Sequence, residues 1–129
     1  MSRNRETVEV QIPAMLAVGQ RPDVLIWRQQ AGLFRAYDNP RRVVRVGIPG
    51  ASDAMAIVAV TITPDMVGQT LGVAVAPEFK TTDGRQRAAQ RDYQRAVEQR
   101  GGLYVVCRSP DDLTQAIEHL QHNGQRAVP

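Results

Sequence analysis

The segment Glu78-Phe79-Lys80 contains the only lysine of the chain. The chain has 16 lysine and arginine residues, and all the others are arginines. On a strand, alternate side chains point to the same face, so Glu78 and Lys80 are expected to share one face about 6–7 Å apart. A compact ammonium can hold a water or a phosphate oxygen beside a carboxylate, which a planar guanidinium does less readily. The alternative is an ordinary surface lysine at a strand end, which is the commoner meaning of an isolated Glu-x-Lys.

A second carboxylate, Asp53, stands at the start of the apolar, β-branched run 54–63. We expect the run 71–80 to return antiparallel to it, with Pro64–Gln69 closing the hairpin. In such a hairpin the start of one strand lies opposite the end of the other, so Asp53 and Glu78 should converge.

Two converging carboxylates would suit Mg²⁺, which takes a few hard oxygen ligands and fills its octahedron with waters and substrate phosphate. The backbone carbonyl of Phe79, between Glu78 and Lys80, is a natural further ligand. A metal held there lowers the pKa of a bound water and neutralises charge on a phosphate under attack. In this arrangement Lys80 orients that water or stabilises the same charge.

Length and composition indicate one ordinary globular domain over residues 1–129. The chain is 43% hydrophobic and 22% charged, with no run long enough to span a membrane and no signal-peptide pattern. Its single cysteine, Cys107, lies in an apolar strand-like run and reads as a small buried hydrophobe. A reducing cytoplasm, of a bacterium or a phage-infected host, is the compartment we expect.

The net charge of +3 is mild, but the arginines cluster in sequence. Guanidinium forks suit phosphate oxygens, which favours a polyanionic partner; solvated charges on a helix face explain the cluster equally well. The cluster consists of Arg41, Arg42, Arg45, Arg85, Arg87, Arg91, Arg95 and Arg100.

The order of expected elements is α-β-β-β-β-α-β-α, which predicts an α/β fold with a central mixed sheet flanked by helices. The segment 31–39 is expected to cross irregularly, and the first few residues and 124–129 to be flexible. Expected helices cover 7–18, 85–100 and 110–123; expected strands cover 24–28, 42–46, 54–63, 71–80 and 103–108.

From about Glu9 to Asp112 the chain resembles the VRR-NUC nucleases of the PD-(D/E)xK superfamily. The resemblance implies a restriction-endonuclease-like core. The blocks that carry it are Val24-Leu25-Ile26-Trp27-Arg28, Gly47-Ile48-Pro49-Gly50-Ala51-Ser52-Asp53, Glu78-Phe79-Lys80, Gly84-Arg85-Gln86 with Gln90, and Gly101-Gly102-Leu103-Tyr104-Val105-Val106.

The resemblance assigns roles to individual positions. It implies that Asp53 and Glu78 bind the metal, that Lys80 is the catalytic lysine and that Gln90 faces the active site. Glu9 resembles the acid of the first helix that helps to hold the metal or its waters.

Three positions complicate this assignment. Glu6 is a rival to Glu9, and Pro13 allows either a helix that starts near Val10 or a kinked longer one. Pro77 departs from the family pattern, since it cannot donate a hydrogen bond to a neighbouring strand.

The implied function is Mg²⁺-dependent hydrolysis of DNA phosphodiesters, with Mn²⁺ expected to substitute. Small stand-alone relatives resemble Holliday-junction resolvases, so we expect structure-selective cutting of branched or duplex DNA by a homodimer. The alternatives are a DNA-binding module without turnover and a subunit that needs a replication or repair partner. The arginines expected to grip the DNA backbone are Arg41, Arg42, Arg85, Arg87 and Arg91.

Overall fold

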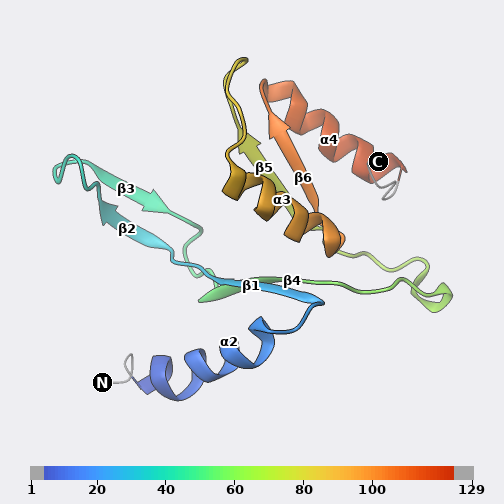
Figure 1. The fold of residues 1–129 in the computed structure, drawn as a ribbon, viewed down its shortest axis with the longest axis horizontal. Coiled ribbons are helices and arrows are strands. Elements are labelled where there is room, and N and C mark those ends of the chain that lie inside the picture. The colour runs from blue at the N-terminus through green and yellow to red at the C-terminus, as the bar shows by residue number, and fades with distance from the viewer. Residues whose placement is uncertain (1–4, 124–129) are drawn as a thin grey trace. The chain divides into compact units, whose positions relative to one another are not determined.

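The computed structural model describes residues 5–123, and the chain is of mixed α/β class, with three two-stranded sheets. The strands thus do not form one central mixed sheet within this range. The described chain divides after Val58 into two compact units, of which the first contains α2 and β1 to β4 and the second β5, α3, β6 and α4 (Figure 1). The expected flexibility of the first residues and of 124–129 falls largely outside the described residues.

The first unit begins with a helix that changes its winding. A π-helical segment, η1 (Glu6–Gln11), continues into the α-helix α2 (Ile12–Gly19), with Pro13 in the first turn of α2. The N–H of Ile12 accordingly donates to the carbonyl of Thr7, five residues back. Because proline has no N–H and its ring crowds the carbonyl four residues earlier, wider winding before it is the expected response. The helix predicted over 7–18 is confirmed.

Strands β1 (Val24–Arg28) and β4 (Ala54–Val58) form an antiparallel pair in which Val24 lies opposite Val58. Helix α2 packs on β1, and the buried residues of this unit are Val24 and Ile57. The predicted strand over 24–28 is confirmed, whereas the one predicted over 54–63 ends at Val58.

Strands β2 (Gly32–Arg35) and β3 (Val43–Val46) form a second antiparallel pair. The expected irregular crossing over 31–39 is therefore wrong, while the strand predicted over 42–46 is confirmed with one residue less. A turn before β3 makes the hairpin: the Asn39 side-chain oxygen accepts from the backbone N–H of Arg41 at 3.1 Å, and the Asn39 carbonyl accepts from that of Arg42 at 2.9 Å. Asn followed by Pro is a turn signal of this kind.

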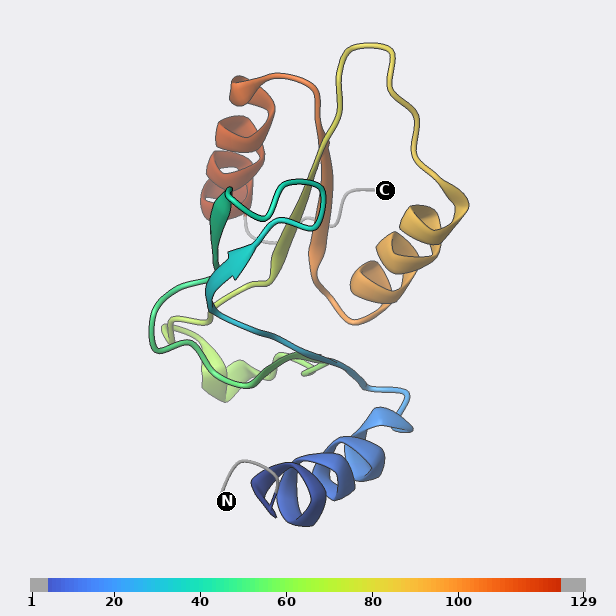
Figure 2. The ribbon, with the colours of Figure 1, turned by 90° about the vertical axis from the view of Figure 1, so that its left-hand side faces the viewer.

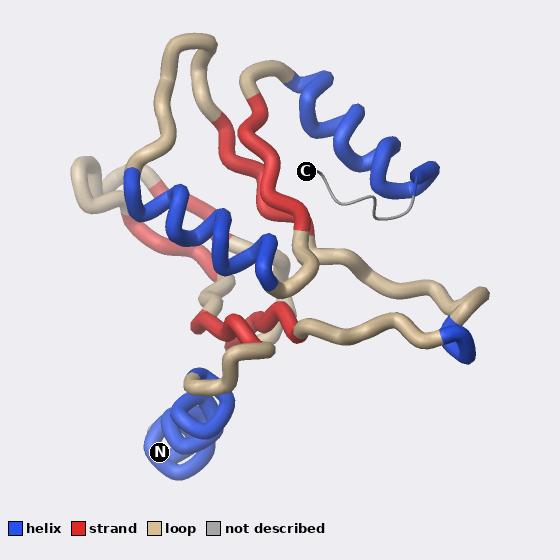
Figure 3. Tube along the Cα trace, turned by 45° about the vertical axis from the view of Figure 1, so that its right-hand side comes forward, coloured by secondary structure: helices blue, strands red, loops and turns tan. Residues whose placement is uncertain are grey.

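The predicted hairpin between the runs 54–63 and 71–80 does not form. Between β4 and β5 (Val75–Phe79), the only regular element is one 3₁₀ turn, η2 (Pro64–Met66), drawn in Figure 3 as a short blue turn within a long tan connection. Strand β5 pairs instead in parallel with β6 (Leu103–Cys107). The reason is topological, because a helix between two strands brings the second strand back parallel to the first.

That helix is α3 (Ala88–Gln99), and α4 (Pro110–Asn123) follows β6. Figure 2 shows α3 and α4 on opposite sides of the β5–β6 pair. The core of this unit consists of Val97, Tyr104 and Cys107, which confirms Cys107 as a buried strand residue. Gly101 ends α3 with a φ of 87°, a conformation that only glycine adopts without strain.

Ser109 directly precedes Pro110, the first residue of α4, and the side chain of Asp112 reaches back to this end of the helix. The carboxylate of Asp112 accepts from the backbone N–H groups of Arg108 at 2.7 Å and Ser109 at 3.2 Å, and these bonds lower the pKa of Asp112. Among the described residues, no helix combines the length and apolar character that crossing a bilayer requires.

Candidate functional site

The end of β5 has the reverse of the usual strand pattern. The side chains of Glu78 and Lys80 are only 12% and 17% exposed, whereas Phe79 between them is 70% exposed. Burying two charges costs several kcal/mol per ion before their mutual attraction is counted. A surface lysine at a strand end would have its ammonium in water, so the ordinary interpretation of Glu-x-Lys fails here.

The two oxygens of Glu78 have different surroundings. Oε1 accepts a hydrogen bond from the phenolic hydroxyl of Tyr104. Oε2 lies 3.4 Å from the Nζ of Lys80, yet no described donor makes a hydrogen bond to it. Glu78 and Lys80 therefore attract each other as charges without a hydrogen bond between them. The buried Oε2 of Glu78 is left to accept another ligand.

The parallel register explains how Tyr104 reaches Glu78. Ala76 lies opposite Tyr104 and Glu78 opposite Val106, so Tyr104 and Glu78 are on the same face of the pair. Helix α3 packs on this face, where the ring of Tyr93 meets that of Tyr104 edge-on at a centroid distance of 6.2 Å. Tyr104 thus contacts both the Glu78 carboxylate and a ring of α3.

Burial raises the pKa of the Tyr104 phenol above its ordinary value, and the hydrogen bond to Glu78 raises it further. The side chain of Gln86 beside the phenol acts in the opposite sense and lowers this pKa. Gln86 in turn donates from Nε2 to Oε1 of Gln94 at 2.9 Å. A polar chain thus runs from Glu78 into α3.

Sequence reasoning missed Tyr104 and Gln86 as members of this site. The available signal was a tyrosine inside a run of buried aliphatic residues, because a buried phenol needs a hydrogen-bond partner. Its partner depends on the strand register, which local sequence does not reveal.

The loop that follows Lys80 is held by one side chain. Nη1 of Arg108 donates to the carbonyls of Thr81 at 2.7 Å, Thr82 at 3.3 Å and Gly84 at 2.7 Å. The backbone N–H of Lys80 also donates to the carbonyl of Cys107 at 3.0 Å. These bonds fix the loop 81–84 and the base of the Lys80 side chain to the end of β6.

Gln90, expected to face the site, has a different contact. Its Oε1 accepts from the backbone N–H of Arg87 at 2.8 Å and caps α3, which consequently starts at Ala88 rather than at the expected Arg85. Glutamine at the third helical position commonly plays this capping role. Gln86, four residues earlier, is the glutamine that lies beside Tyr104.

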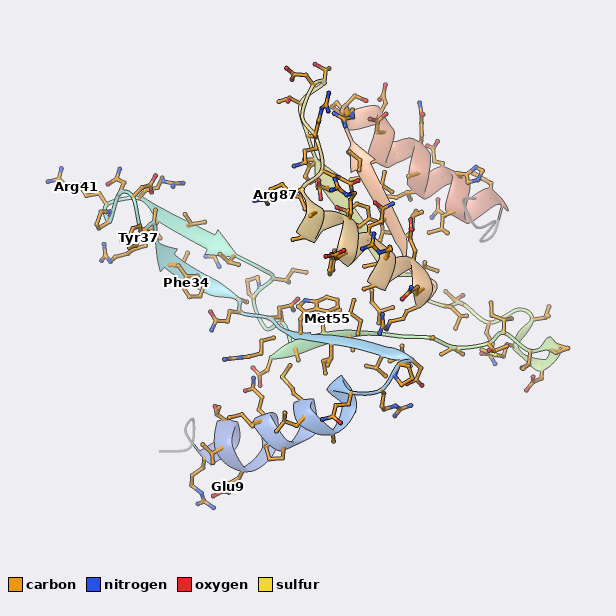
Figure 4. All side chains as sticks on the ribbon, viewed as in Figure 1. Glu9, Phe34, Tyr37, Arg41, Met55 and Arg87 are labelled. Carbon is orange, nitrogen blue, oxygen red and sulfur yellow. The ribbon has the colours of Figure 1, made fainter. Side chains whose placement is uncertain are left out.

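In the first unit, Asp53 lines a groove of about 1240 Å³ together with Glu6, Arg28 and Gln29. Glu9 does not line it: its carboxylate pairs with Arg5 at 3.0 Å on the side of the helix turned away from β1 (Figure 4). Of the two rival acids, Glu6 therefore shares the groove with Asp53.

Asp53 and Glu78 belong to different units, and the hairpin on which their expected convergence rested is absent from the described chain. Inside the described range, no three His, Cys, Asp or Glu side chains are arranged to hold a metal ion. The metal site with Asp53, Glu78 and the Phe79 carbonyl stays a prediction.

The predicted DNA-binding arginines lie in two places. Arg41 and Arg42 belong to the β2–β3 hairpin, where Arg42 pairs with Asp38 at 3.2 Å. Arg85, Arg87 and Arg91 lie around the start of α3, all exposed, and Arg91 donates to the carbonyl of Gln86 at 2.9 Å.

Comparison of the chain with protein-family models, curated proteins and solved structures gave no match. The resemblance to the VRR-NUC nucleases is a prediction from the sequence alone.

Proposed function

We propose that this chain is a Mg²⁺-dependent endonuclease of VRR-NUC type that hydrolyses DNA phosphodiester bonds. The observation that carries the proposal is the inverted pattern at the end of β5, where the charged side chains of Glu78 and Lys80 are mostly covered and that of Phe79 is exposed. In most strands the aromatic side chain is buried and the charged side chains are exposed, because this arrangement is the more stable one. Exceptions to this rule concentrate at functional sites.

The surroundings of Glu78 fit a metal-binding role. Its Oε2 is a buried oxygen without a hydrogen-bond donor, which is the kind of hard ligand that Mg²⁺ takes. Asp53 is the second proposed carboxylate and the Phe79 carbonyl a third proposed oxygen. The bound ion would supply charge neutralisation and a more acidic water.

The protein side chains have separate parts in hydrolysis. The oxygen of water adds to phosphorus, one P–O ester bond breaks, and the departing oxygen takes a proton. Lys80 donates hydrogen bonds from Nζ to the attacking water or to a non-bridging phosphate oxygen, where negative charge builds up. Tyr104 occupies Oε1 of Glu78 and so orients its Oε2. Arg108 keeps the loop after Lys80 in place.

The same reasoning extends the proposal to fold and assembly. Strands β5 and β6 with α3 supply part of a restriction-endonuclease-like core. Arginine contacts to phosphates position DNA without reading its sequence, so cutting depends on DNA structure, with a Holliday junction as the leading substrate. Paired incision of a two-fold junction by a domain with one site needs a homodimer.

The decisive experiment is cleavage of a labelled four-way junction beside matched duplex and single strand, with Mg²⁺, Mn²⁺ or EDTA. The wild type should cut with either metal and not in EDTA. Lys80→Ala should bind the junction normally and lose roughly 10²–10³-fold in rate, as expected for removal of one transition-state donor. Lys80→Arg should not restore the rate, because the guanidinium is planar and larger.

Tight junction binding by the wild type, without a cut under any metal, would overturn the proposal and identify a DNA-binding module. Activity that arises only with a replication or repair protein added would identify a subunit of a larger assembly.

A further inference from the structure

The excess charge of the chain lies in one place. Segment 31–50, which comprises the β2–β3 hairpin and its flanks, has four arginines and one aspartate, hence a charge of +3. The remainder of the chain has twelve basic and twelve acidic residues and sums to zero. The hairpin therefore accounts for the whole net charge of the protein.

The arginines of the hairpin are available to a ligand. Of these four arginines, only Arg42 has an acidic partner among the described residues, namely Asp38. Arg41 and Arg45 are exposed without one, and Arg35 donates only to the carbonyl of Pro40, at 3.0 Å.

The two faces of the hairpin differ in chemistry. Arg35 lies opposite Val43 and Leu33 opposite Arg45, so Arg35 and Arg45 project from the same face as diagonal neighbours, about 7–8 Å apart. The other face consists of Phe34, Val44 and Val46, and Phe34 lines the groove of its unit. The basic face is the one turned away from that groove.

An aromatic ring stands at the tip. Tyr37, in the turn between β2 and β3, has a relative exposure of 104%, so its ring packs against no other residue (Figure 4). Arg41 lies in the same turn region. An unsupported tyrosine beside unpaired arginines combines the two elements that bind exposed nucleobases, which are a stacking surface and cations for the phosphates.

We propose that the β2–β3 hairpin is a DNA-binding arm whose tip residue, Tyr37, stacks on an unpaired base. A two-stranded antiparallel ribbon is narrow enough for the major groove, with Arg35 and Arg45 facing phosphates. The inference rests on the proposed function only in taking DNA as the polyanion. It adds a reason for preferring branched or distorted DNA, since intact duplex offers no free base to the ring.

The test measures binding in EDTA, where no cleavage occurs. Fluorescence anisotropy compares a labelled duplex with the same duplex containing a bulge of unpaired bases. The wild type should bind the bulged DNA more tightly. Tyr37→Ala should lose roughly 5- to 150-fold in affinity for the bulged DNA and little for the intact duplex, while Tyr37→Phe should behave as wild type.

The charge component needs a control that leaves net charge equal. The variant Arg35→Gln/Arg41→Gln/Arg45→Gln is compared with Arg5→Gln/Arg21→Gln/Arg95→Gln, whose arginines each pair with an acid. Both triple variants have a formal charge of zero. Only the first should weaken binding to both DNAs, with a slope of log affinity against log salt reduced by about 2.7. Circular dichroism checks that each variant is folded.

An equal loss of DNA affinity in both triple variants would overturn the proposal of a DNA-binding arm, because binding would then depend on net charge and not on the position of the arginines. An unchanged preference for bulged DNA in Tyr37→Ala would overturn the stacking role. Tighter binding to anionic phospholipid vesicles than to either DNA at the same ionic strength would identify a membrane-binding arm instead. A protein that binds through the hairpin but never cuts would refute the nuclease and leave the arm intact.

Discussion

Tyr104 on β6 donates its hydroxyl to one oxygen of Glu78 on β5, while the other oxygen lies 3.4 Å from the ammonium of Lys80. One buried carboxylate thus interacts with a neutral donor and a cation at the same time. The tyrosine is fixed by α3 through Tyr93 and by the parallel register of β5 with β6. The orientation of Glu78 therefore depends on three elements of the second unit.

Removing the tyrosine hydroxyl should weaken the fold. Tyr104→Phe leaves Oε1 of a buried carboxylate without its donor, and an unsatisfied buried group costs about 1–3 kcal/mol. Urea unfolding should show a lower midpoint with an unchanged slope. Tyr37→Phe is the matched control, since the Tyr37 side chain is fully exposed and the change should stay within about 0.5 kcal/mol. Equal stability of the two variants would contradict the contact.

The raised pKa of Tyr104 predicts a loss of stability in alkali. The folded protein holds this proton more tightly than the unfolded chain does, so stability is complete below the ordinary tyrosine pKa of 10.0 and falls as pH rises above it. The melting temperature of the wild type should decline above that pH. Tyr104→Phe should decline less steeply, and the two curves should approach each other in strong alkali. Parallel curves would show that Tyr104 does not titrate in this range.

Glu78 and Lys80 should behave as an energetically coupled pair. Lys80→Met leaves a mostly covered carboxylate without its cation, so the loss should approach the cost of about 3–5 kcal/mol for removing one partner of a fully buried pair. Adding Glu78→Gln to that variant should recover part of the loss. A double-mutant cycle measured by chemical denaturation should give a coupling energy of about 0.5–3 kcal/mol. Additive effects would mean that the two charges do not interact.

Gly102 should not accept a methyl group. A Cβ there would lie 2.8 Å from Cγ1 of Val97, which is fully buried, and 3.4 Å from the carbonyl of Ala74. Gly102→Ala should therefore destabilise the protein by about 1–3 kcal/mol, the usual cost of overpacking. Gly72→Ala is the control, because a Cβ at that position meets nothing within 4 Å. Thermal unfolding of the two variants makes the comparison, and similar melting temperatures would exclude the close packing at Gly102.

Arg108→Gln should loosen the loop after Lys80 while preserving the core. The substitution removes the guanidinium that donates to the carbonyls of Thr81, Thr82 and Gly84. Hydrogen exchange followed by mass spectrometry should show faster exchange in peptides covering 80–86 and unchanged exchange in β6. Arg95→Gln, whose arginine contacts only the exposed Asp92, should leave both regions unchanged. Uniform acceleration would instead indicate global destabilisation.

Local signals in the sequence were enough for most elements of the fold. Gly101-Gly102 marks the end of α3, and Ser109-Pro110 with two acids marks the start of α4, because cap and turn chemistry is written in neighbouring residues. Strands β1, β3 and β6 follow from short β-branched runs.

The strand pairing was beyond local signals. The run after Asp53 is almost uniformly apolar and so favours no particular partner, and nothing near it indicates that β1, about 30 residues earlier, pairs with it. The prediction chose the neighbouring run and was wrong. Tyr104 was missed for the same reason, because local sequence does not reveal strand register. Its contact with Glu78 exists only when β5 and β6 are parallel and Ala76 lies opposite Tyr104.

Because Lys80 is the only lysine of the chain, the proposed site can be labelled selectively by chemical modification. Reagents that acylate amines can modify this sequence only at Lys80 and at an amino terminus, so the extent of labelling at one peptide reports how accessible the ammonium beside Glu78 is. Any ligand that covers or displaces that ammonium would change the reaction rate at a single residue. Because the other basic side chains are arginines, the labelling rate at Lys80 reports whether a ligand occupies the candidate site, without any engineered probe.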